Sequence, residues 1–161
     1  MIVVADTSPL NYLILIGQID VLQKIYGEVL IPPAVLTEMI SPRAPEIVRA
    51  WIGNLPLWIE IRTPNHWQIP SNPKLGLGEL EAIALIQTGG PGSVLLIDER
   101  AGRQEAARLR IKVTGTLGIL QEAARLGLLN LKSAIEDLRV TNFNATDSFL
   151  REFIKRADAA P

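Results

Sequence analysis

The chain has 161 residues, of which 48% are hydrophobic and 20% charged, with a formal net charge of −1 at pH 7. This composition predicts an ordinary globular protein, and the small net charge excludes a global basic field for nucleic acid, so any polyanion site must be local. The absence of cysteine excludes disulfides and thiolate metal sites.

The first eight residues form a short apolar run that ends in an acid, Asp6, and two hydroxyls. The run lacks a basic leader and is too short for a signal peptide or a membrane span, so we expect a cytoplasmic protein without a membrane segment. A continuous apolar run is typical of a strand buried on both faces, as in a parallel sheet. Asp6 would stand where this strand leaves the sheet, which is where open α/β sheets bind ligands. A plain helix cap is the alternative.

Strand and helix signals alternate along the rest of the chain. Strands are predicted at 28–31, 57–61, 93–97 and 111–114, and helices at 10–26 with a break near Gly17, 33–40, 45–51, 76–87, 101–110, 116–126, 131–138 and 146–157. The proline-rich segment 62–75 is predicted to be a loop. The alternation indicates an α/β fold of three layers, α/β/α, around a mainly parallel sheet. We expect one domain over residues 1–161.

Asp98 repeats the pattern of Asp6, because it directly follows the strongest strand signal of the chain, residues 93–97. The carboxyl ends of parallel strands meet at one edge of a sheet, and neighbouring strands are about 4.8 Å apart. Two carboxylates that close together repel, and one takes up a proton unless a cation lies between them. Mg²⁺ or Mn²⁺ is the cation that such oxygens favour. Two independent helix caps would leave the repeated pattern unexplained.

Two glutamates add to this pair. Glu79 stands in the first turn of a helix that is otherwise apolar nearly all round. The helix dipole also favours an acid there, so a structural role is the alternative. Glu81 lies about 200° further around this helix and cannot point at the same site. Glu38 is the single acid of its short helix, while Glu99 and the loop residue His66 are given no role.

Basic side chains gather after Asp98. The segment from Arg100 to Lys112 holds five basic residues and one acid, which gives a local charge of +4. We expect Arg103, one turn after Asp98, to contact a phosphate of the substrate. Arg108 and Arg110 fit a solvated helix face better.

Two short segments share the strand-then-acid pattern, namely Ala5-Asp6-Thr7-Ser8-Pro9-Leu10 and Leu96-Ile97-Asp98-Glu99. Together they resemble the PIN domain, the fold of metal-dependent ribonucleases such as the VapC-type toxins. Similarity to this family, and to a prokaryotic branch in which a helix begins Gly-Glu-x-Glu-Ala, is also found in segments 32–38, 78–85, 102–103 and 114–118. The resemblance covers roughly residues 2–130, and helices at about 131–157 follow it.

This resemblance implies a set of site residues. The acids around one or two Mg²⁺ or Mn²⁺ ions would be Asp6, Glu38, Glu79 and Asp98, with Asp6, Asp98 and Glu79 as metal ligands. Thr7 or Ser8 would help to hold Asp6 or a water at the metal, and Thr116 falls near the same edge as a further substrate-site residue. Many PIN toxins have Asp in place of Glu79, so it stays open whether Glu79 binds metal directly or through water.

The pattern and the resemblance predict a divalent-metal-dependent endoribonuclease acting on RNA, with the toxin of a toxin–antitoxin pair as one role. A non-catalytic module that binds nucleic acid or protein is the alternative. An aspartyl-phosphate phosphatase is disfavoured because Ser8 stands where that mechanism needs a second Asp. Apolar surface around Trp51, Trp58 and Trp67 predicts a homodimer, and a small antitoxin protein would cover the acidic edge.

Overall fold

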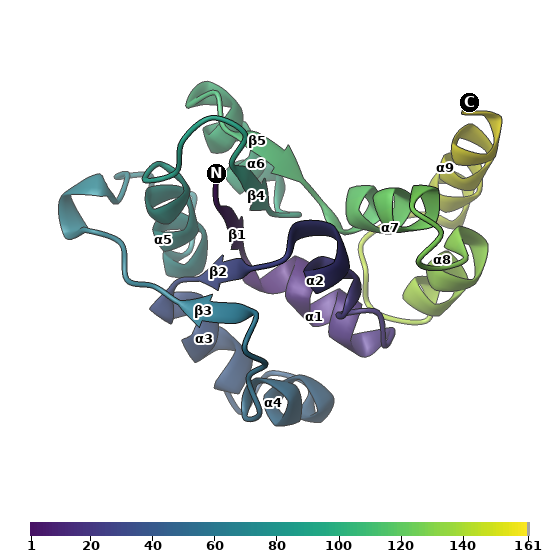
Figure 1. Cartoon of the computed structure of the whole chain (residues 1–161), viewed down its shortest axis with the longest axis horizontal. Coiled ribbons are helices and arrows are strands. Elements are labelled where there is room, and N and C mark those ends of the chain that lie inside the picture. Colours follow the sequence, from purple (N-terminus) through teal and green to yellow (C-terminus); the bar gives the residue numbers. More distant parts are fainter. Residues whose placement is uncertain (161) are drawn as a thin grey trace.

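The computed structural model, which describes residues 1–160, has a five-stranded sheet with every strand pair parallel (Figure 1). The strands are β1 (Val3–Ala5), β2 (Val29–Ile31), β3 (Ile59–Ile61), β4 (Val94–Leu96) and β5 (Lys112–Thr114), in the order β3-β2-β1-β4-β5. β1 therefore lies in the middle, paired with β2 on one side and β4 on the other. The five predicted strands are all present, and the sheet is parallel throughout.

Helices connect the strands as predicted. Within residues 1–160 they are α1 (Thr7–Leu15), α2 (Val21–Tyr26), α3 (Pro33–Ile40), α4 (Glu46–Ile52), α5 (Leu77–Ile86), α6 (Arg100–Arg108), α7 (Thr116–Arg125), α8 (Leu131–Arg139) and α9 (Asp147–Ala159). The expected break falls at Gly17, whose positive φ of 70° ends the first helix and favours a residue without a side chain. No helix in this part of the chain combines the length and the apolar character that a membrane crossing requires.

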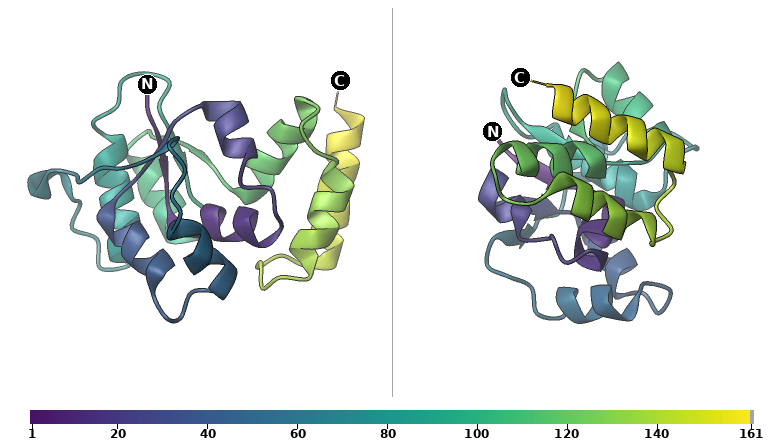
Figure 2. Two further views of the ribbon diagram at one scale, coloured as in Figure 1. Left: turned by 60° about the horizontal axis from the view of Figure 1, so that its bottom comes forward. Right: turned by 90° about the vertical axis from the view of Figure 1, so that its right-hand side faces the viewer.

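Alternating side chains of the central strands enter two separate cores. Val3 and Ala5 point to the face that carries α1, α2 and α7, whereas Val4 packs with buried residues of α5 and α6 on the opposite face. This follows from the strand itself, in which successive side chains point to opposite faces. The sheet is thus covered by helices on both sides (Figure 2), which confirms the three-layer α/β/α architecture.

The C-terminal helices extend the layer that contains α7. α8 packs on α7, and α9 packs on α8, side by side at the end of the molecule far from β3 (Figures 1 and 2). Leu138 and Leu150 are buried in the same core as α1, and Phe153 packs partly buried against it. The amphipathic pattern predicted over 146–157 therefore reflects a docked helix.

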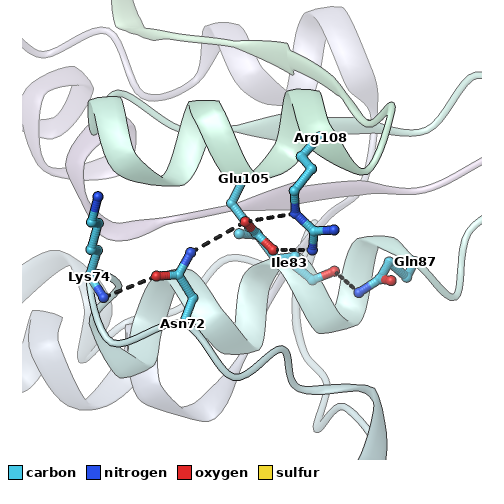
Figure 3. Close-up of polar contacts among 6 residues, drawn as sticks. All are labelled: Asn72, Lys74, Ile83, Gln87, Glu105 and Arg108. Atoms are coloured by element: carbon cyan, nitrogen blue, oxygen red, sulfur yellow. Dashed lines mark hydrogen bonds and ion pairs between the residues drawn. The ribbon is translucent and has the colours of Figure 1, made fainter.

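The segment 62–75 is irregular apart from one short 3₁₀ turn at His66–Gln68. Asn72 ties its far end to α6, because the Asn72 amide donates to Glu105, which also accepts from Arg108 (Figure 3). The expected gathering of three tryptophans is only partly present. The rings of Trp51 and Trp58 pack 6.1 Å apart, whereas Trp67 is 87% exposed on the loop.

Candidate active site

The register of the sheet sets the positions of Asp6 and Asp98. Ala5 of β1 pairs with Leu96 of β4, and the Asp6 N–H donates to the Leu96 carbonyl at 2.9 Å. Asp6 is therefore the first residue beyond its strand, level with Ile97, and Asp98 follows one position later. Both acids leave the sheet at its carboxyl edge, as the sequence predicts.

Asp6 is the most deeply buried acid of this edge, with only 4% of its surface exposed. Burial and, to a smaller extent, the like charges of Glu38, Glu79 and Asp98 together raise the pKa of Asp6 from 3.8 to about 7. A hydrogen bond from the Thr7 N–H opposes this shift in pKa. Asp6 thus stands in a negative environment that disfavours its own ionisation.

Thr116 holds Asp98 in place through two hydrogen bonds. The Thr116 N–H donates to one carboxylate oxygen and its hydroxyl donates to the other, each at 2.7 Å. Burial raises the pKa of Asp98, while the bonds from Thr116 and the positive charge of Arg103 lower it. Thr116 has the predicted place near the edge, but it is fully buried, so what it offers is a fixed position for Asp98.

A glycine lets Asp98 and Arg103 approach the start of α7. A β-carbon at Gly115 would lie 2.8 Å from Asp98 Oδ1 and 2.9 Å from Arg103 Nη1. Both are closer than real β-carbon contacts, so a side chain here would displace the acid or the guanidinium. Arg103 itself is exposed. The start of α7 therefore needs a glycine at position 115, because Asp98 and Arg103 lie close against it.

Glu38 and Glu79 come from two helices that meet at this edge. α3 packs against both α1 and α5, which brings Glu38 to the Thr7 hydroxyl that donates to it. A β-carbon at Gly78 would lie 2.7 Å from Glu38 Oε1, so the glycine permits this close approach. Glu79 accepts from the Gly76 N–H at 2.9 Å, and burial followed by like charges raises the pKa of Glu79.

The neighbouring acid Glu81 points elsewhere, in agreement with the 200° expected from helix geometry. Its carboxylate accepts from the Ala34 N–H at 2.8 Å, in the first turn of α3. An acid at a helix N-terminus satisfies a free N–H and complements the dipole. Glu81 thus fixes α3, and with it Glu38, a role that the sequence alone did not reveal because it depends on where α3 packs.

The donor set suits a hard divalent cation, because carboxylate oxygens are the ligands that Mg²⁺ and Mn²⁺ prefer. The raised pKa of the buried Asp6 fits this as well, since a nearby cation would compensate the charge that burial disfavours. Asp6, Asp98 and Glu79 are the residues that would hold such an ion. Among residues 1–160, no three Asp, Glu or His side chains converge as a ready-made metal site.

Two open grooves flank the acids, one on each side of the first turn of α1. A groove of about 570 Å³ includes Ser8 and Asp98 and extends toward α9. A smaller one of about 360 Å³ includes Thr7 and Glu38 and extends toward Arg43. Neither groove could be predicted from the sequence, because their far walls come from distant segments.

The basic segment divides into two parts. Arg103 lines the larger groove beside Asp98, where we expected a phosphate contact. Arg108 has an exposed side chain, as expected of a solvated helix face, but it makes a 2.6 Å ion pair with the buried Glu105 on the side of α6 that faces α5 (Figure 3). His66 is exposed on the loop and makes no contact with the acids.

Comparison with known proteins points to one family. The family model described as a PIN domain matches residues 2–159, which is nearly the whole chain and includes the C-terminal helices. No curated protein and no solved structure gives a significant match.

Proposed function

Since the chain belongs to the PIN-domain family, whose members are generally nucleases, we propose that it is a Mg²⁺- or Mn²⁺-dependent endoribonuclease. One observation carries the proposal. Asp6 is buried at the carboxyl edge of the central strand, and its pKa is raised to about 7 by burial and by three neighbouring acids. A structural helix cap would gain nothing from this surplus of negative charge, whereas a cation site requires it.

The four acids would have different roles, which follow from how each carboxylate is held. Asp6 and Asp98 would bind the cation from adjacent strands, with Thr116 keeping Asp98 in position. Glu79 would be the third ligand, directly or through water. Glu38, fixed by the Thr7 hydroxyl, would orient the attacking water from the opposite side.

A divalent cation held there would lower the pKa of the attacking water and offset the charge that builds on the phosphate oxygens. Arg103 would hold a phosphate of the RNA at the mouth of the larger groove. Ser8 lines the same groove and would contact that phosphate or the water. Because water attacks in place of the ribose 2′-hydroxyl, the products would carry 5′-phosphate and 3′-hydroxyl ends.

The test is cleavage of single-stranded RNA with Mn²⁺ by the purified protein and by Asp98→Asn. We expect cleavage by the wild type and a loss of about 100-fold or more in the variant, since removing one preorganised electrostatic group costs this much. Glu46→Gln, an exposed acid in the first turn of α4, is the matched control and should cleave normally. Wild-type protein without activity and without measurable Mn²⁺ binding would refute the proposal.

The second candidate function is a non-catalytic PIN module that binds nucleic acid or protein. It predicts RNA binding that needs no metal and persists in Asp98→Asn, without cleavage. The same samples therefore separate the two candidates.

The biological role and the assembly are further parts of the proposal. We propose a cytoplasmic toxin that a small antitoxin protein covers at the acidic edge, and a homodimer. Exposed apolar side chains support an interface, foremost Leu57, Trp67 and Val140. Sedimentation at micromolar concentration should give a dimer, and co-expression with the product of the neighbouring gene should yield a stable complex.

A further inference from the structure

The larger groove beside Asp98 has an unusual wall. All three phenylalanines of the chain line it, namely Phe143, Phe149 and Phe153, together with Tyr12 from α1. The three come from α9 and from the turn before it, and they face a groove whose other end holds Asp98. A volume of about 570 Å³ lies within the range of about 300–1,000 Å³ typical of small-ligand sites.

Packing accounts for three of these rings but not for Phe149, because Tyr12, Phe143 and Phe153 lie partly buried against the core. The rings of Tyr12 and Phe143 meet edge to face, with centroids 5.0 Å apart and planes at 89°, so each holds the other. Phe149 is 55% exposed, although α9 already buries Leu150 and partly buries Phe153 in the core. An exposed ring beside a fixed aromatic pair is suited to stack on a flat apolar ligand.

Two arginines accompany the aromatic wall, beside the acids Asp98 and Glu99 of the same groove. Arg100 and Arg103 line the same groove and are exposed, and within residues 1–160 neither makes an ion pair. Their guanidinium groups are therefore available to an anion that enters between α6 and α9. Aromatic rings together with arginines are the combination by which proteins bind single-stranded nucleic acid.

We propose that this groove binds one unpaired nucleobase of the RNA, adjacent to the phosphate at Asp98. The base stacks on Phe149 beside the Tyr12–Phe143 pair, while Arg100 and Arg103 hold the adjoining phosphate. The inference rests on the proposed nuclease function and adds a base-stacking subsite beside the acids, which requires an unpaired base because a base inside a duplex cannot leave its stack without cost.

The experiment measures binding of a fluorescein-labelled single-stranded RNA octamer by anisotropy, once in EDTA and once in Ca²⁺. Phe149→Ala should weaken binding about 5- to 100-fold, which corresponds to the loss of one stacked base. Phe149→Trp should restore it. Ile47→Ala removes a similarly exposed apolar side chain of α4, outside the groove, and should bind as the wild type does.

A second arm identifies the bound base. Octamers with a single abasic nucleotide, placed at each position in turn, should lose affinity for the wild type at one position only. At that position Phe149→Ala should add no further loss, because the stack is already absent. Unchanged melting temperatures of the variants would show that the fold is retained.

Equal binding of RNA by the wild type and Phe149→Ala would overturn the proposal, and the groove would then be open to a protein partner instead. So would equal affinity for duplex RNA, or no binding in either buffer. Cleavage with Mn²⁺ is scored separately. A protein that cleaves but shows no effect at Phe149 loses this proposal alone, and a protein that stacks the base but never cleaves loses the nuclease proposal alone.

Discussion

The acidic edge has two halves that differ in how their carboxylates are held. Asp6 and Asp98 follow adjacent strands, and the sheet bonds the N–H of Asp6 to Leu96 and the N–H of Ile97, just before Asp98, to Thr114. Glu38 and Glu79 stand on helices, and their longer side chains are tied by one hydrogen bond each, from Thr7 and Gly76. Asp6 is buried, whereas Glu38 is exposed. We infer that the strand half, Asp6 and Asp98, holds its carboxylates in fixed positions, whereas the helix half, Glu38 and Glu79, can adjust the positions of its carboxylates.

The largest expected effect is a pH dependence of the folding stability that arises from Asp6. The folded pKa of Asp6 is raised from 3.8 to about 7, so the folded protein binds more protons than the unfolded chain in this window. Without metal, stability should therefore fall as pH rises from about 4 to about 7, by about 3 kcal/mol from this one group. Urea unfolding in EDTA at pH 4 and pH 8 measures it.

Asp6→Asn is the variant that isolates this contribution, because an amide cannot ionise. Its stability relative to the wild type should increase between pH 4 and pH 8. Addition of Mn²⁺ at pH 8 should stabilise the wild type more than Asp6→Asn. A wild type and an Asp6→Asn variant with parallel pH dependence would contradict the assignment of a buried, raised carboxyl.

The next effect concerns the groups that hold each half. Thr116→Val keeps the shape of a fully buried side chain but removes the hydroxyl that donates to Asp98 at 2.7 Å. We expect Mn²⁺ affinity to fall about 10- to 100-fold, as is typical when a partner of a metal ligand is lost. Thr7→Val removes the corresponding bond to Glu38 and should cost less than Thr116→Val. Calorimetric titration with Mn²⁺ compares the two, and a larger loss in Thr7→Val would reverse the order that we assign.

A pair of glycines tests the same contrast sterically. Gly115→Ala places a β-carbon 2.8 Å from Asp98, which cannot move because Thr116 fixes both oxygens. Gly78→Ala meets Glu38 at 2.7 Å, but this longer, exposed side chain can swing aside. We expect about tenfold lower RNA cleavage in Gly115→Ala and a smaller change in Gly78→Ala. Gly90→Ala has open space around the added carbon and serves as the control. Equal losses in the two glycine variants would argue against a rigid and an adjustable half.

Much of this acidic edge could be predicted from the sequence, because the end of a buried strand determines where the next residue lies. Asp6 and Asp98 each end a buried apolar run, and parallel strands bring their ends together whatever the loops do. Helix geometry likewise predicted that Glu79 and Glu81 diverge. What each of them contacts could not be predicted, since the Ala34 N–H becomes a partner of Glu81 only when α3 packs beside α5.

The aromatic groove shows the opposite case. Phe149 and Phe153 lie on an amphipathic helix, and their spacing alone indicates a face packed on the core. Only the docking of α9 onto α8, which packs on α7, brings these rings toward Asp98. Such contacts join segments that are far apart in sequence, and local patterns carry no information about them. The basic segment falls between the two cases, because its charge was evident but its division between Arg103 and Arg108 was not.

That division gives the smallest expected effect. Arg103 lines the groove beside Asp98, whereas Arg108 of the same helix is paired with the buried Glu105 on the side that faces α5. Arg103→Ala should weaken RNA binding about 3- to 10-fold and reduce the salt dependence of the affinity by about one unit of slope, because one phosphate contact is lost. Arg108→Ala should leave both unchanged, since its charge is already neutralised by its partner. Anisotropy titrations between 50 and 200 mM salt would measure both quantities. Equal salt dependence of the affinity in the two variants would mean that RNA responds to the total charge of α6. A specific phosphate contact of Arg103 in the groove would then be refuted.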